Sequence, residues 1–385
     1  MDYNFDEVIP RRGSNSVKWD LAPNDEVLPM WVADMDFKTA PCVIEALQKR
    51  VGHGIFGYTD APQAYYDAII NWWSRRHNFT IKKGWIISST GVIAALSATI
   101  KALTETGDQV LVLSPVYNHF FDAVENTGRE MVCSNLIYQD NYYTIDFNDF
   151  EQKAAQPKAK LLLLCNPHNP IGRVWTQQEL TRIGEICLKH NVVVVSDEIH
   201  SDLVYDDFTH VPFASINEDF LNYSVTLGAP SKTFNLAGLQ VGNIISANAA
   251  YRKKINEKLN EHETWIISPF AVEALIAAYN NGEGWLEALK KYLWDNYVYL
   301  KDFFAAQLPQ FKVLPLQATY LVWVDISTVG EQSQKVADNL LKNQKLWVNS
   351  GTMYGEAGEG FLRINIACPR ALLAEGLNRF KVGFV

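Results

Sequence analysis

The segment KLLLLCNPHNPIGRVWTQQELTRIGEICLKHNVVVVSDEIH (residues 160–200) contains two apolar runs separated by an amphipathic stretch. The runs at 160–164 and 192–196 have the length and composition of strands, and residues 176–190 have the spacing of a helix. A strand, a helix and a second strand in this order indicate parallel strands of one sheet that a helix covers. Because both runs are apolar without alternation, we expect the strands to be buried on both faces.

The same alternation of strand and helix patterns extends in both directions from this segment. Further apolar or β-branched runs lie at 85–89, 110–113, 131–137, 223–227 and 241–246, and a helix-like segment lies at 92–106. The pattern predicts an α/β fold whose large domain has a mostly parallel seven-stranded sheet flanked by helices. We place this large domain at residues 48–282.

The two ends of the chain differ from this central pattern. The first 50 residues are largely irregular, with one expected helix at 42–51. Expected helices follow at 249–264, 269–280 and 283–307, and then a strand at 319–325, a helix at 332–344 and a strand at 361–366. We expect a smaller α+β domain formed by both chain termini, residues 1–47 and 283–385.

Composition and charge exclude several classes of protein. The chain has 385 residues, of which 48% are hydrophobic and 20% charged, which is typical of a folded globular protein. The net charge of −9 argues against an overall basic surface for nucleic acid. The apolar runs are far shorter than the roughly 20 residues that span a bilayer. The acidic N-terminus, MDYNFDEVIPRR, lacks the pattern of a signal peptide. The sequence therefore predicts neither a nucleic-acid partner nor a membrane location.

The cysteines indicate a reducing compartment. There are five, an odd number, and they are widely scattered without a CxxC pair: Cys42, Cys133, Cys165, Cys187 and Cys368. This spacing argues against a disulfide framework and against a zinc site. We therefore expect a cytoplasmic protein that holds no metal.

Two polar clusters follow expected strands and could contact a ligand there, because open α/β sheets bind ligands at the carboxyl ends of their strands. The segment SSTGVIAA (88–95) opens a helix with small residues, which favours phosphate binding by free backbone N–H groups. The alternative is ordinary helix capping by Ser89 or Thr90. The segment CNPHNPIGR (165–173) contains two Asn-Pro pairs that can direct Asn side chains outward, or it is simply a proline-rich loop.

Two further clusters contain ionisable residues. In SDEIH (196–200), Asp197 follows a buried strand and needs a cationic partner, which is either an Arg or a protonated ring nitrogen of a cofactor. A metal site of Asp197, Glu198 and His200 lacks a second supporting cluster. In LGAPSKTFNLAGL (227–239), Lys232 lies in an apolar, glycine-containing turn where its amine could act as a nucleophile rather than as a surface charge.

Taken together, the four clusters are more specific than any one of them. A phosphate-binding helix start, an Asn loop, a buried Asp and a turn Lys follow successive strands in that order. These are the groups that hold pyridoxal phosphate: a Schiff-base lysine, a carboxylate for the pyridinium nitrogen and dipoles for the phosphate.

On these residues the sequence resembles the fold-type I pyridoxal-phosphate enzymes, the aspartate aminotransferase superfamily. Within it the chain is similar to the MalY/PatB-like cystathionine β-lyase (C–S lyase) subgroup, and the match extends over residues 1–385. The segments that carry the resemblance are WVADMDF (31–37), GIFGYT (54–59), LLCNPHNPIGR (163–173), SDEIH (196–200), PSKTFNLAGL (230–239) and FLRINIACPR (361–370).

The resemblance implies a role for each matching residue. Lys232 would be the catalytic lysine bound to the cofactor, and Asp197 would keep the ring nitrogen protonated. The remaining expected cofactor contacts are Asn169 and His200 at the ring oxygen, Tyr117 on the ring face, and Gly91, Val92, Ile93 and Ser231 at the phosphate. Tyr58 would reach the phosphate of the neighbouring subunit, which implies a homodimer with shared active sites.

Arg363 would bind the substrate carboxylate, a task that suits its planar guanidinium group, and Asn169 and Ala33 would also contact the substrate. Two positions depart from the pattern of many aminotransferases. Ala229 stands where a phosphate-binding Ser is common, and Gln240 stands where an Arg is common. We therefore expect the phosphate to depend more on the helix start and on Tyr58.

The resemblance implies a β-lyase that cleaves L-cystathionine and related S-substituted cysteines to a thiol such as homocysteine, pyruvate and ammonia. The alternative is a class I/II aminotransferase dependent on pyridoxal phosphate, because Lys232, Asp197 and Arg363 serve both reactions. A third interpretation is a protein-binding surface rich in aromatics such as Trp72, Trp73 and Trp294. Burial of these tryptophans in a core or a dimer interface is the simpler expectation.

Overall fold

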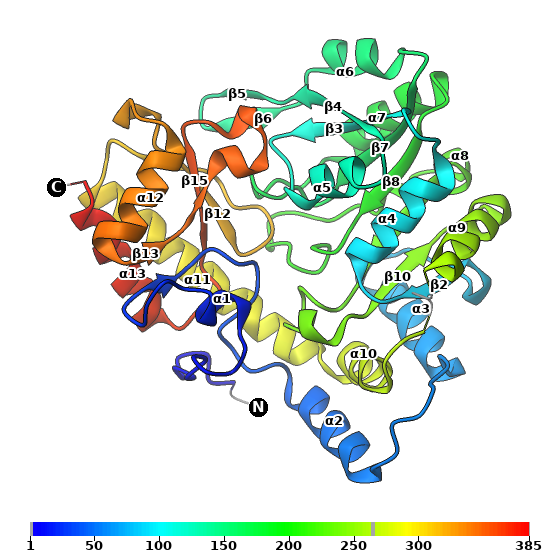
Figure 1. The fold of residues 1–385 in the computed structure, drawn as a ribbon, viewed down its shortest axis with the longest axis horizontal. Coiled ribbons are helices and arrows are strands. Elements are labelled where there is room, and N and C mark those ends of the chain that lie inside the picture. Colours follow the sequence, from blue (N-terminus) through cyan, green and yellow to red (C-terminus); the bar gives the residue numbers. More distant parts are fainter. Residues whose placement is uncertain (1–2, 263–265, 385) are drawn as a thin grey trace.

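A seven-stranded sheet forms the centre of the computed structural model, which describes residues 3–262 and 266–384 (Figure 1). The strand order is β2-β10-β9-β8-β7-β3-β4. The strands span Ile86–Ser89 (β2), Gln109–Ser114 (β3), Glu130–Asn135 (β4), Ala159–Cys165 (β7), Val193–Asp197 (β8), Ser224–Gly228 (β9) and Gly242–Ile245 (β10). All the pairings are parallel except those of β10, which is antiparallel to both of its neighbours.

The sheet is buried on both faces, as its uniformly apolar strands predict. In β7, Leu161 and Leu163 belong to a hydrophobic cluster with α4 (Val92–Leu103), α5 (His119–Glu125) and α9 (Ala249–Glu261). Their neighbours Leu162 and Leu164 pack on the other face with α6 (Phe147–Ala154), α7 (Gln177–Lys189) and α8 (Glu218–Asn222). This alternation follows from the period of two along a strand.

Helix α7 joins the two central strands β7 and β8 and begins at a well-defined cap. The Thr176 hydroxyl accepts a hydrogen bond from the Glu179 N–H, and the Glu179 carboxylate accepts one from the Thr176 N–H. This capping box satisfies N–H groups that the first turn of a helix leaves free. The expected strand-helix-strand order of residues 160–200 is confirmed.

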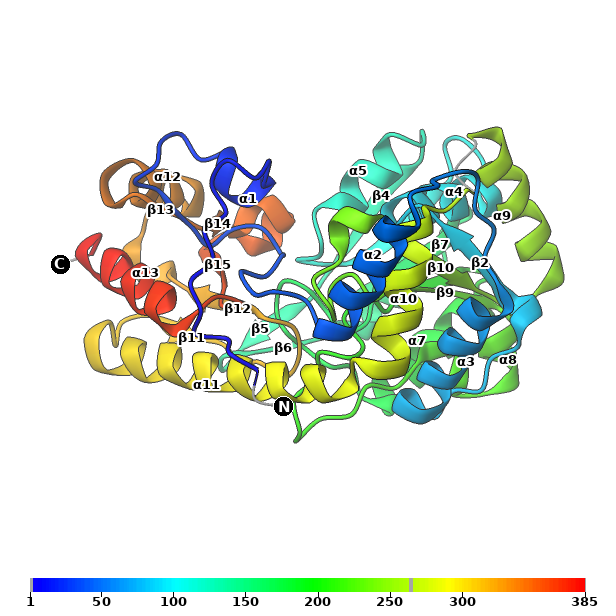
Figure 2. The same cartoon turned by 90° about the horizontal axis from the view of Figure 1, so that it is seen from below.

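A second, antiparallel sheet lies beside the large one, with the strand order β11-β12-β15-β14. Its strands are Lys312–Val313 (β11), Leu321–Asp325 (β12), Asn349–Ser350 (β14) and Phe361–Asn365 (β15). Helices α11 (Glu283–Gln307), α12 (Ser333–Gln344) and α13 (Arg370–Val382) surround it, and Figure 2 shows the long α11 running from this sheet toward the larger one. Two short strands, β5 (Ile137–Gln139) and β6 (Tyr142–Thr144), form a separate hairpin.

The N-terminal segment lies against the C-terminal part of the chain (Figures 1 and 2). Strand β1 (Leu28–Pro29) pairs in parallel with β13 (Leu346–Trp347), and the short helix α1 (Val17–Asp20) precedes it. Helices α2 (Pro41–His53), α3 (Gln63–His77) and α10 (Pro269–Asn281) pack together on the large-sheet side. The chain then passes from β1 to α2 through residues 30–40, which lie between the two sheets.

The expected fold class is confirmed, and a few details differ. The single run expected at 131–137 is divided between β4 and β5, and the strand expected at 319–325 begins at Leu321. Helix α9 ends at Glu261, and residues 263 and 264 of the expected helix lie outside the described residues. The idea of an exposed aromatic surface was wrong for Trp72 and Trp73, which are 1% and 3% exposed because α3 packs them inward. Within the described ranges, no helix is both long and apolar enough to cross a bilayer.

Candidate active site

A cavity of about 290 Å³ lies at the carboxyl ends of strands of the large sheet. It is lined by ten of the residues that the sequence singled out: Ala33, Gly91, Val92, Ile93, Tyr117, Asn169, Asp197, His200, Ser231 and Lys232. These residues come from six separate parts of the chain. Parallel strands bring them together, because their carboxyl ends meet at one edge of the sheet.

Lys232 lies in the turn after β9, and its amine faces the cavity. Its Nζ atom donates a hydrogen bond to the Ala33 carbonyl oxygen at 2.7 Å. Burial and the nearby Arg363 guanidinium lower the pKa of Lys232 to about 8, although the carboxylates of Asp34 and Asp197 act in the opposite direction. More of the amine is therefore neutral near physiological pH than in an ordinary lysine, and the neutral form is the one that acts as a nucleophile or base.

Asp197 is the last residue of β8 and is 3% exposed. Its Oδ1 atom accepts a hydrogen bond from the Ile199 N–H at 3.2 Å, and among the described residues no Arg or Lys forms an ion pair with it. Burial raises the pKa of Asp197 to about 7, and the Ile199 N–H and Lys232 offset only part of this rise. A cation placed in the cavity would restore the ionised form.

The start of helix α4 leaves backbone N–H groups free at the cavity. Gly91, the residue before the helix, has a φ of +103°, and no side chain caps the helix. The Ser89 hydroxyl instead donates to the Gly91 carbonyl at 3.2 Å, so the alternative of capping by Ser89 or Thr90 is not what the structure contains. Free N–H groups and the positive end of the helix dipole make this start a suitable place for an anion.

Arg363 lies beside the cavity on β15 and is 4% exposed. Its Nη1 atom donates to the Asn169 side-chain oxygen at 3.1 Å, and its Nη2 atom donates to the Trp31 carbonyl at 2.8 Å. The guanidinium group also stacks on the Tyr354 ring at 4.7 Å from the centroid. The smaller sheet therefore places a fixed cation next to Asn169 of the larger one.

His200 and Glu198 separate into two environments although they are close in sequence. Burial, together with the charges of Lys232 and Arg363, lowers the pKa of His200 to about 3, so its ring is neutral. Its Nδ1 atom has no hydrogen-bond partner among the residues that the structure describes. Glu198 instead accepts from Ser196, from the Phe213 N–H and from His210 at 2.9 Å. Within the described residues, no group of three or more His, Cys, Asp or Glu side chains could hold a metal ion.

Three further positions differ in how they relate to the cavity. Tyr58 does not line the cavity of its own chain, since its side chain is 99% exposed in the loop after α2. Gln240 does line the cavity and adopts a left-handed φ of +53°. Ala229 is buried at the end of β9 and offers no hydroxyl group to the cavity.

Several residues that support the site were not predicted. The Tyr320 hydroxyl donates to the Ala33 carbonyl at 2.9 Å. Asn235 and Asn365 bind backbone atoms of residues 32–37, the segment that contains Ala33. Asn235 and Asn365 stand within segments that the sequence did single out, but a single sequence gives no signal for which distant backbone an Asn contacts.

Comparison with known proteins agrees with this geometry. The family model described as "Aminotransferase class I and II" matches residues 25–380. The chain is 44% identical over 382 residues to "Cystathionine beta-lyase PatB" of Bacillus subtilis (strain 168), covering 98% of this chain and 99% of that protein. It is 34% identical to "Protein MalY" of Escherichia coli (strain K12), covering 97% of each chain.

A solved structure gives the same result in three dimensions. Cystalysin from Treponema denticola, whose crystal structure contains a pyridoxal 5'-phosphate cofactor, matches with a TM-score of 0.97 and 35% sequence identity. The match covers 100% of this chain and 99% of cystalysin. With a family match over most of its length and relatives well above 30% identity, the chain belongs to the class I and II aminotransferase family, close to its cystathionine β-lyases.

Proposed function

We propose that the cavity binds pyridoxal 5'-phosphate. The observation that carries this proposal is that two ionisable groups with pKa values shifted by burial, Lys232 and Asp197, line one small cavity. The carboxylate of Asp197 lacks a cationic partner, and a protonated ring nitrogen supplies one. The lowered pKa of the Lys232 amine suits covalent capture of an aldehyde, because the neutral form is the nucleophile.

The other cavity residues fit the remaining parts of the cofactor. The free N–H groups of Gly91, Val92 and Ile93, with the Ser231 hydroxyl, would bind the phosphate. Tyr117 would contact the face of the cofactor ring. Asn169 and the neutral His200, whose Nδ1 atom has no partner, would bind the ring oxygen.

Arg363 would bind the α-carboxylate of an amino-acid substrate. Its guanidinium group is buried and fixed by Asn169 and Trp31, so it offers a charged, oriented donor at the edge of the cavity. A guanidinium group can bind a carboxylate through two parallel N–H donors. Asn169 and the Ala33 backbone would complete this substrate-binding side.

The function that these groups support best is carbon–sulfur β-lyase activity on L-cystathionine and related S-substituted cysteines. Bound pyridoxal phosphate supplies the electron sink that allows the substrate to lose its Cα proton and then its β-thiolate. The amine of Lys232, with its pKa near neutrality, would take the Cα proton as general base. The products are a thiol such as homocysteine, pyruvate and ammonia.

Aminotransferase activity is the second candidate, because the family as a whole carries that description and the same three charged residues serve it. The relatives named above favour the lyase, since the PatB protein of B. subtilis is called a cystathionine β-lyase. Product analysis separates the two reactions.

The test measures absorbance of the purified protein with L-cystathionine and assays thiol and pyruvate. A cofactor band with stoichiometric thiol and pyruvate, formed without any keto acid, is the expected result. Amino transfer that requires a keto acid and releases no thiol would replace the lyase by an aminotransferase. Absence of a band after addition of pyridoxal phosphate would overturn the cofactor as well.

We also propose that the protein acts as a homodimer in which Tyr58 reaches the phosphate site of the partner. The full exposure of Tyr58 in the single chain supports this, because the ring has no contact in its own cavity. The domain limits, 48–282 for the large domain and 1–47 with 283–385 for the small one, stay a prediction that the two separate sheets support. A cytoplasmic location also stays a prediction, which the five unpaired cysteines support.

A further inference from the structure

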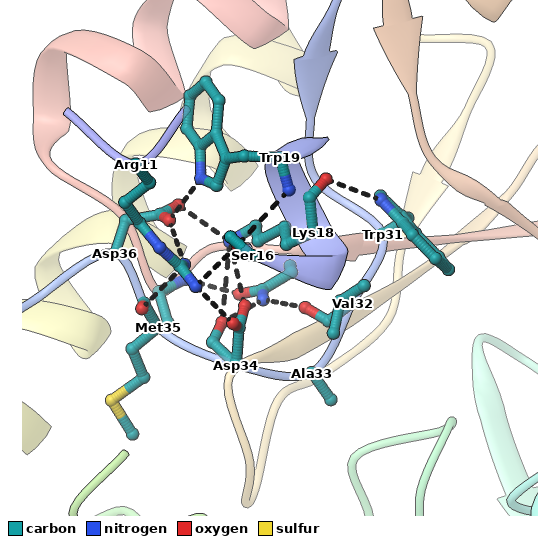
Figure 3. Close-up of polar contacts among 12 residues, drawn as sticks. Arg11, Ser16, Lys18, Trp19, Trp31, Val32, Ala33, Asp34, Met35 and Asp36 are labelled. Carbon is teal, nitrogen blue, oxygen red and sulfur yellow. Dashed lines mark hydrogen bonds and ion pairs between the residues drawn. The ribbon is translucent and has the colours of Figure 1, made fainter. Parts of the chain in front are cut away.

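Four charged side chains near the N-terminus form a cluster, and none of them is among the residues proposed above to contact the cofactor or the substrate. They are Arg11, Lys18, Asp34 and Asp36, named here the N-terminal ion cluster (Figure 3). We propose that the N-terminal ion cluster positions the Ala33 carbonyl group against the amine of Lys232. The proposal rests on the proposed function and deepens it, because it assigns positioning residues to the proposed base.

The cluster is tightly bonded and largely buried. Lys18 Nζ lies 2.7 Å from one oxygen of Asp36, and Arg11 Nη1 lies 2.6 Å from the other. The exposed fractions of Lys18 and Asp36 are 1% and 4%. The Trp19 indole N–H also donates to Asp36 at 2.8 Å. Because burying charges costs several kcal/mol per ion, such a cluster persists only where other bonds compensate for the lost hydration.

The cluster holds the segment 31–37 from one side. Arg11 uses its fork to bind Asp34 at 2.7 Å, Asp36, and the Met35 carbonyl at 3.1 Å. Figure 3 shows these side chains converging on the segment, while the Ala33 side chain points away from them. One guanidinium group therefore fixes three consecutive residues that directly follow Ala33.

Two asparagines hold the same segment from other elements. Asn235, three residues after Lys232, accepts from the Met35 N–H at 3.0 Å and donates to the Met35 carbonyl at 2.9 Å. Asn365 of β15 donates to the Val32 and Asp34 carbonyls at 2.5 and 2.7 Å. Ala33 therefore lies between two carbonyl groups that are already bound.

The Ala33 carbonyl is the group that this scaffold presents to the cavity. It accepts from Lys232 Nζ at 2.7 Å and from the Tyr320 hydroxyl at 2.9 Å. A backbone carbonyl is the same in every residue type, so its direction depends on the neighbours that hold the chain. Misplacement of a group by about 1 Å can cost on the order of a hundredfold in rate.

The charges that face Lys232 allow the proposal to be tested through a pH profile. They are Arg363 of β15, Asp197 of β8 and Asp34 of the segment 31–37, while His200 is neutral. The Ala33 carbonyl and Asp34 both stabilise the charged form of the amine. If the segment moves away, the neutral amine is favoured and the pKa of Lys232 falls further.

The main variant is Arg11→Lys. It keeps the positive charge but replaces the planar guanidinium, with its several N–H donors, by a single ammonium group. The measurement is the rate at which the full chain, freed of cofactor, takes up pyridoxal phosphate as a function of pH. Only the neutral amine reacts, so the midpoint of the profile follows Lys232. We expect the midpoint to fall by about one pH unit relative to the unchanged protein.

The matched control is Arg129→Lys, at the opposite end of the sheet. Arg129 also uses its fork, binding the Thr104 hydroxyl at 2.9 Å and the carbonyls of Thr104 and Thr127. This variant should lower the melting temperature in the same way but leave the midpoint unchanged. An unshifted midpoint in Arg11→Lys, with the same melting-temperature loss as the control, would mean that the cluster is merely structural and overturn the proposal.

A second variant, Lys18→Met, separates positioning from direct charge. Positioning predicts a lower midpoint here too, since Asp36 loses its partner and the segment loosens. A direct effect of the lysine charge predicts a higher midpoint, because a positive charge near the amine is removed. A raised midpoint therefore contradicts the proposal. If the unchanged protein itself takes up no pyridoxal phosphate, the proposed function fails first, which distinguishes the two failures.

Discussion

At the scale of single residues, burial shifts the proton affinities of Lys232 and Asp197 toward each other. The pKa of the lysine falls to about 8 and that of the carboxyl rises to about 7. Each shift destabilises the folded chain that lacks a cofactor, because burial disfavours the charged forms. The proposed cofactor relieves both costs, since it captures the amine and brings a cation to the carboxylate.

Replacing Lys232 by Ala should abolish turnover and leave the fold intact. The substitution removes the proposed base and the amine that captures the cofactor, and it deletes a partly buried side chain whose charged form is disfavoured in the fold. The measurements are thiol release from L-cystathionine and the circular dichroism spectrum. Turnover at the normal rate in this variant would contradict the assignment of Lys232.

Replacing Asp197 by Asn should flatten the pH dependence of stability in the cofactor-free chain. The pKa of Asp197 in the folded state, about 7, is above the ordinary value of 3.8. Between these two pH values the folded state therefore binds more protons than the unfolded state. The unfolding free energy contributed by this group is therefore lost as pH rises from about 4 to 8. The full loss corresponds to about 2 to 4 kcal/mol.

Urea unfolding of the unchanged protein and of the Asn variant, each at pH 5 and pH 8, checks the direction of this change. Comparing the two proteins removes the contribution of the other titrating groups, which both share. The Asn variant should lose less stability between the two pH values, and it should bind pyridoxal phosphate more weakly. An equal loss in both proteins would mean that Asp197 is already ionised at pH 5.

At the scale of elements, strand β10 sets the shape of the turn before helix α4. A Cβ atom added at Gly242 would lie 2.7 Å from the Gly91 carbonyl carbon and 2.9 Å from the Ser89 hydroxyl. The strand and the turn can approach this closely only because Gly242 has no side chain. The antiparallel pairing of β10 with β2 thus determines where the free N–H groups of α4 point.

The Gly242→Ala variant should therefore weaken phosphate binding while keeping the fold. We expect about tenfold weaker binding of pyridoxal phosphate, the effect of about 1.4 kcal/mol. Absorbance titration should show a smaller change with pyridoxal, which lacks the phosphate. Gly84→Ala is a suitable control, since a Cβ atom there has no heavy atom within 4 Å. An equal loss for both aldehydes would place the effect outside the phosphate site.

Element types were predictable where the pattern is regular. The apolar runs of β7 and β8 and the amphipathic α7 follow directly from local composition. The position of β10 in the sheet was harder to predict from the sequence. This strand pairs antiparallel with both β2 and β9, which are far from each other in sequence. Pairing partners depend on the packing of the whole sheet rather than on any one strand.

At the scale of the whole molecule, the fully exposed Tyr58 supports a site shared between two subunits. In a symmetric dimer each copy would give Tyr58 to the cavity of the other. A complete site then needs Lys232 from one chain and Tyr58 from its partner. This arrangement predicts complementation between two defective variants.

Mixing Tyr58→Ala with Lys232→Ala should restore activity that neither variant has alone. In a statistical mixture, half of the dimers are mixed and each has one intact site, which gives about a quarter of the normal sites. Thiol release after co-refolding measures this. Activity no higher than that of Tyr58→Ala diluted into buffer would mean that each subunit uses its own residues only.

The sequence by itself determined the strand and helix order of residues 85–245 and the identity of the cavity residues Asp197, Asn169 and Lys232. It could do so because strand patterns are local and because polar residues directly after buried strands meet at one sheet edge. The lysine and the aspartate therefore needed no knowledge of long-range contacts.

Only the tertiary structure decided how the segment 31–37 is held. Asn235 binds this segment from 200 positions away, and Asn365 binds it from 331 positions away. The buried ion pair of Lys18 with Asp36 likewise depends on helix α1 meeting the segment 31–37. An Asn or a Lys has the same local preferences whether or not it meets a distant carbonyl or carboxylate, so such contacts are fixed only when packing of the whole chain brings the partners within hydrogen-bond reach.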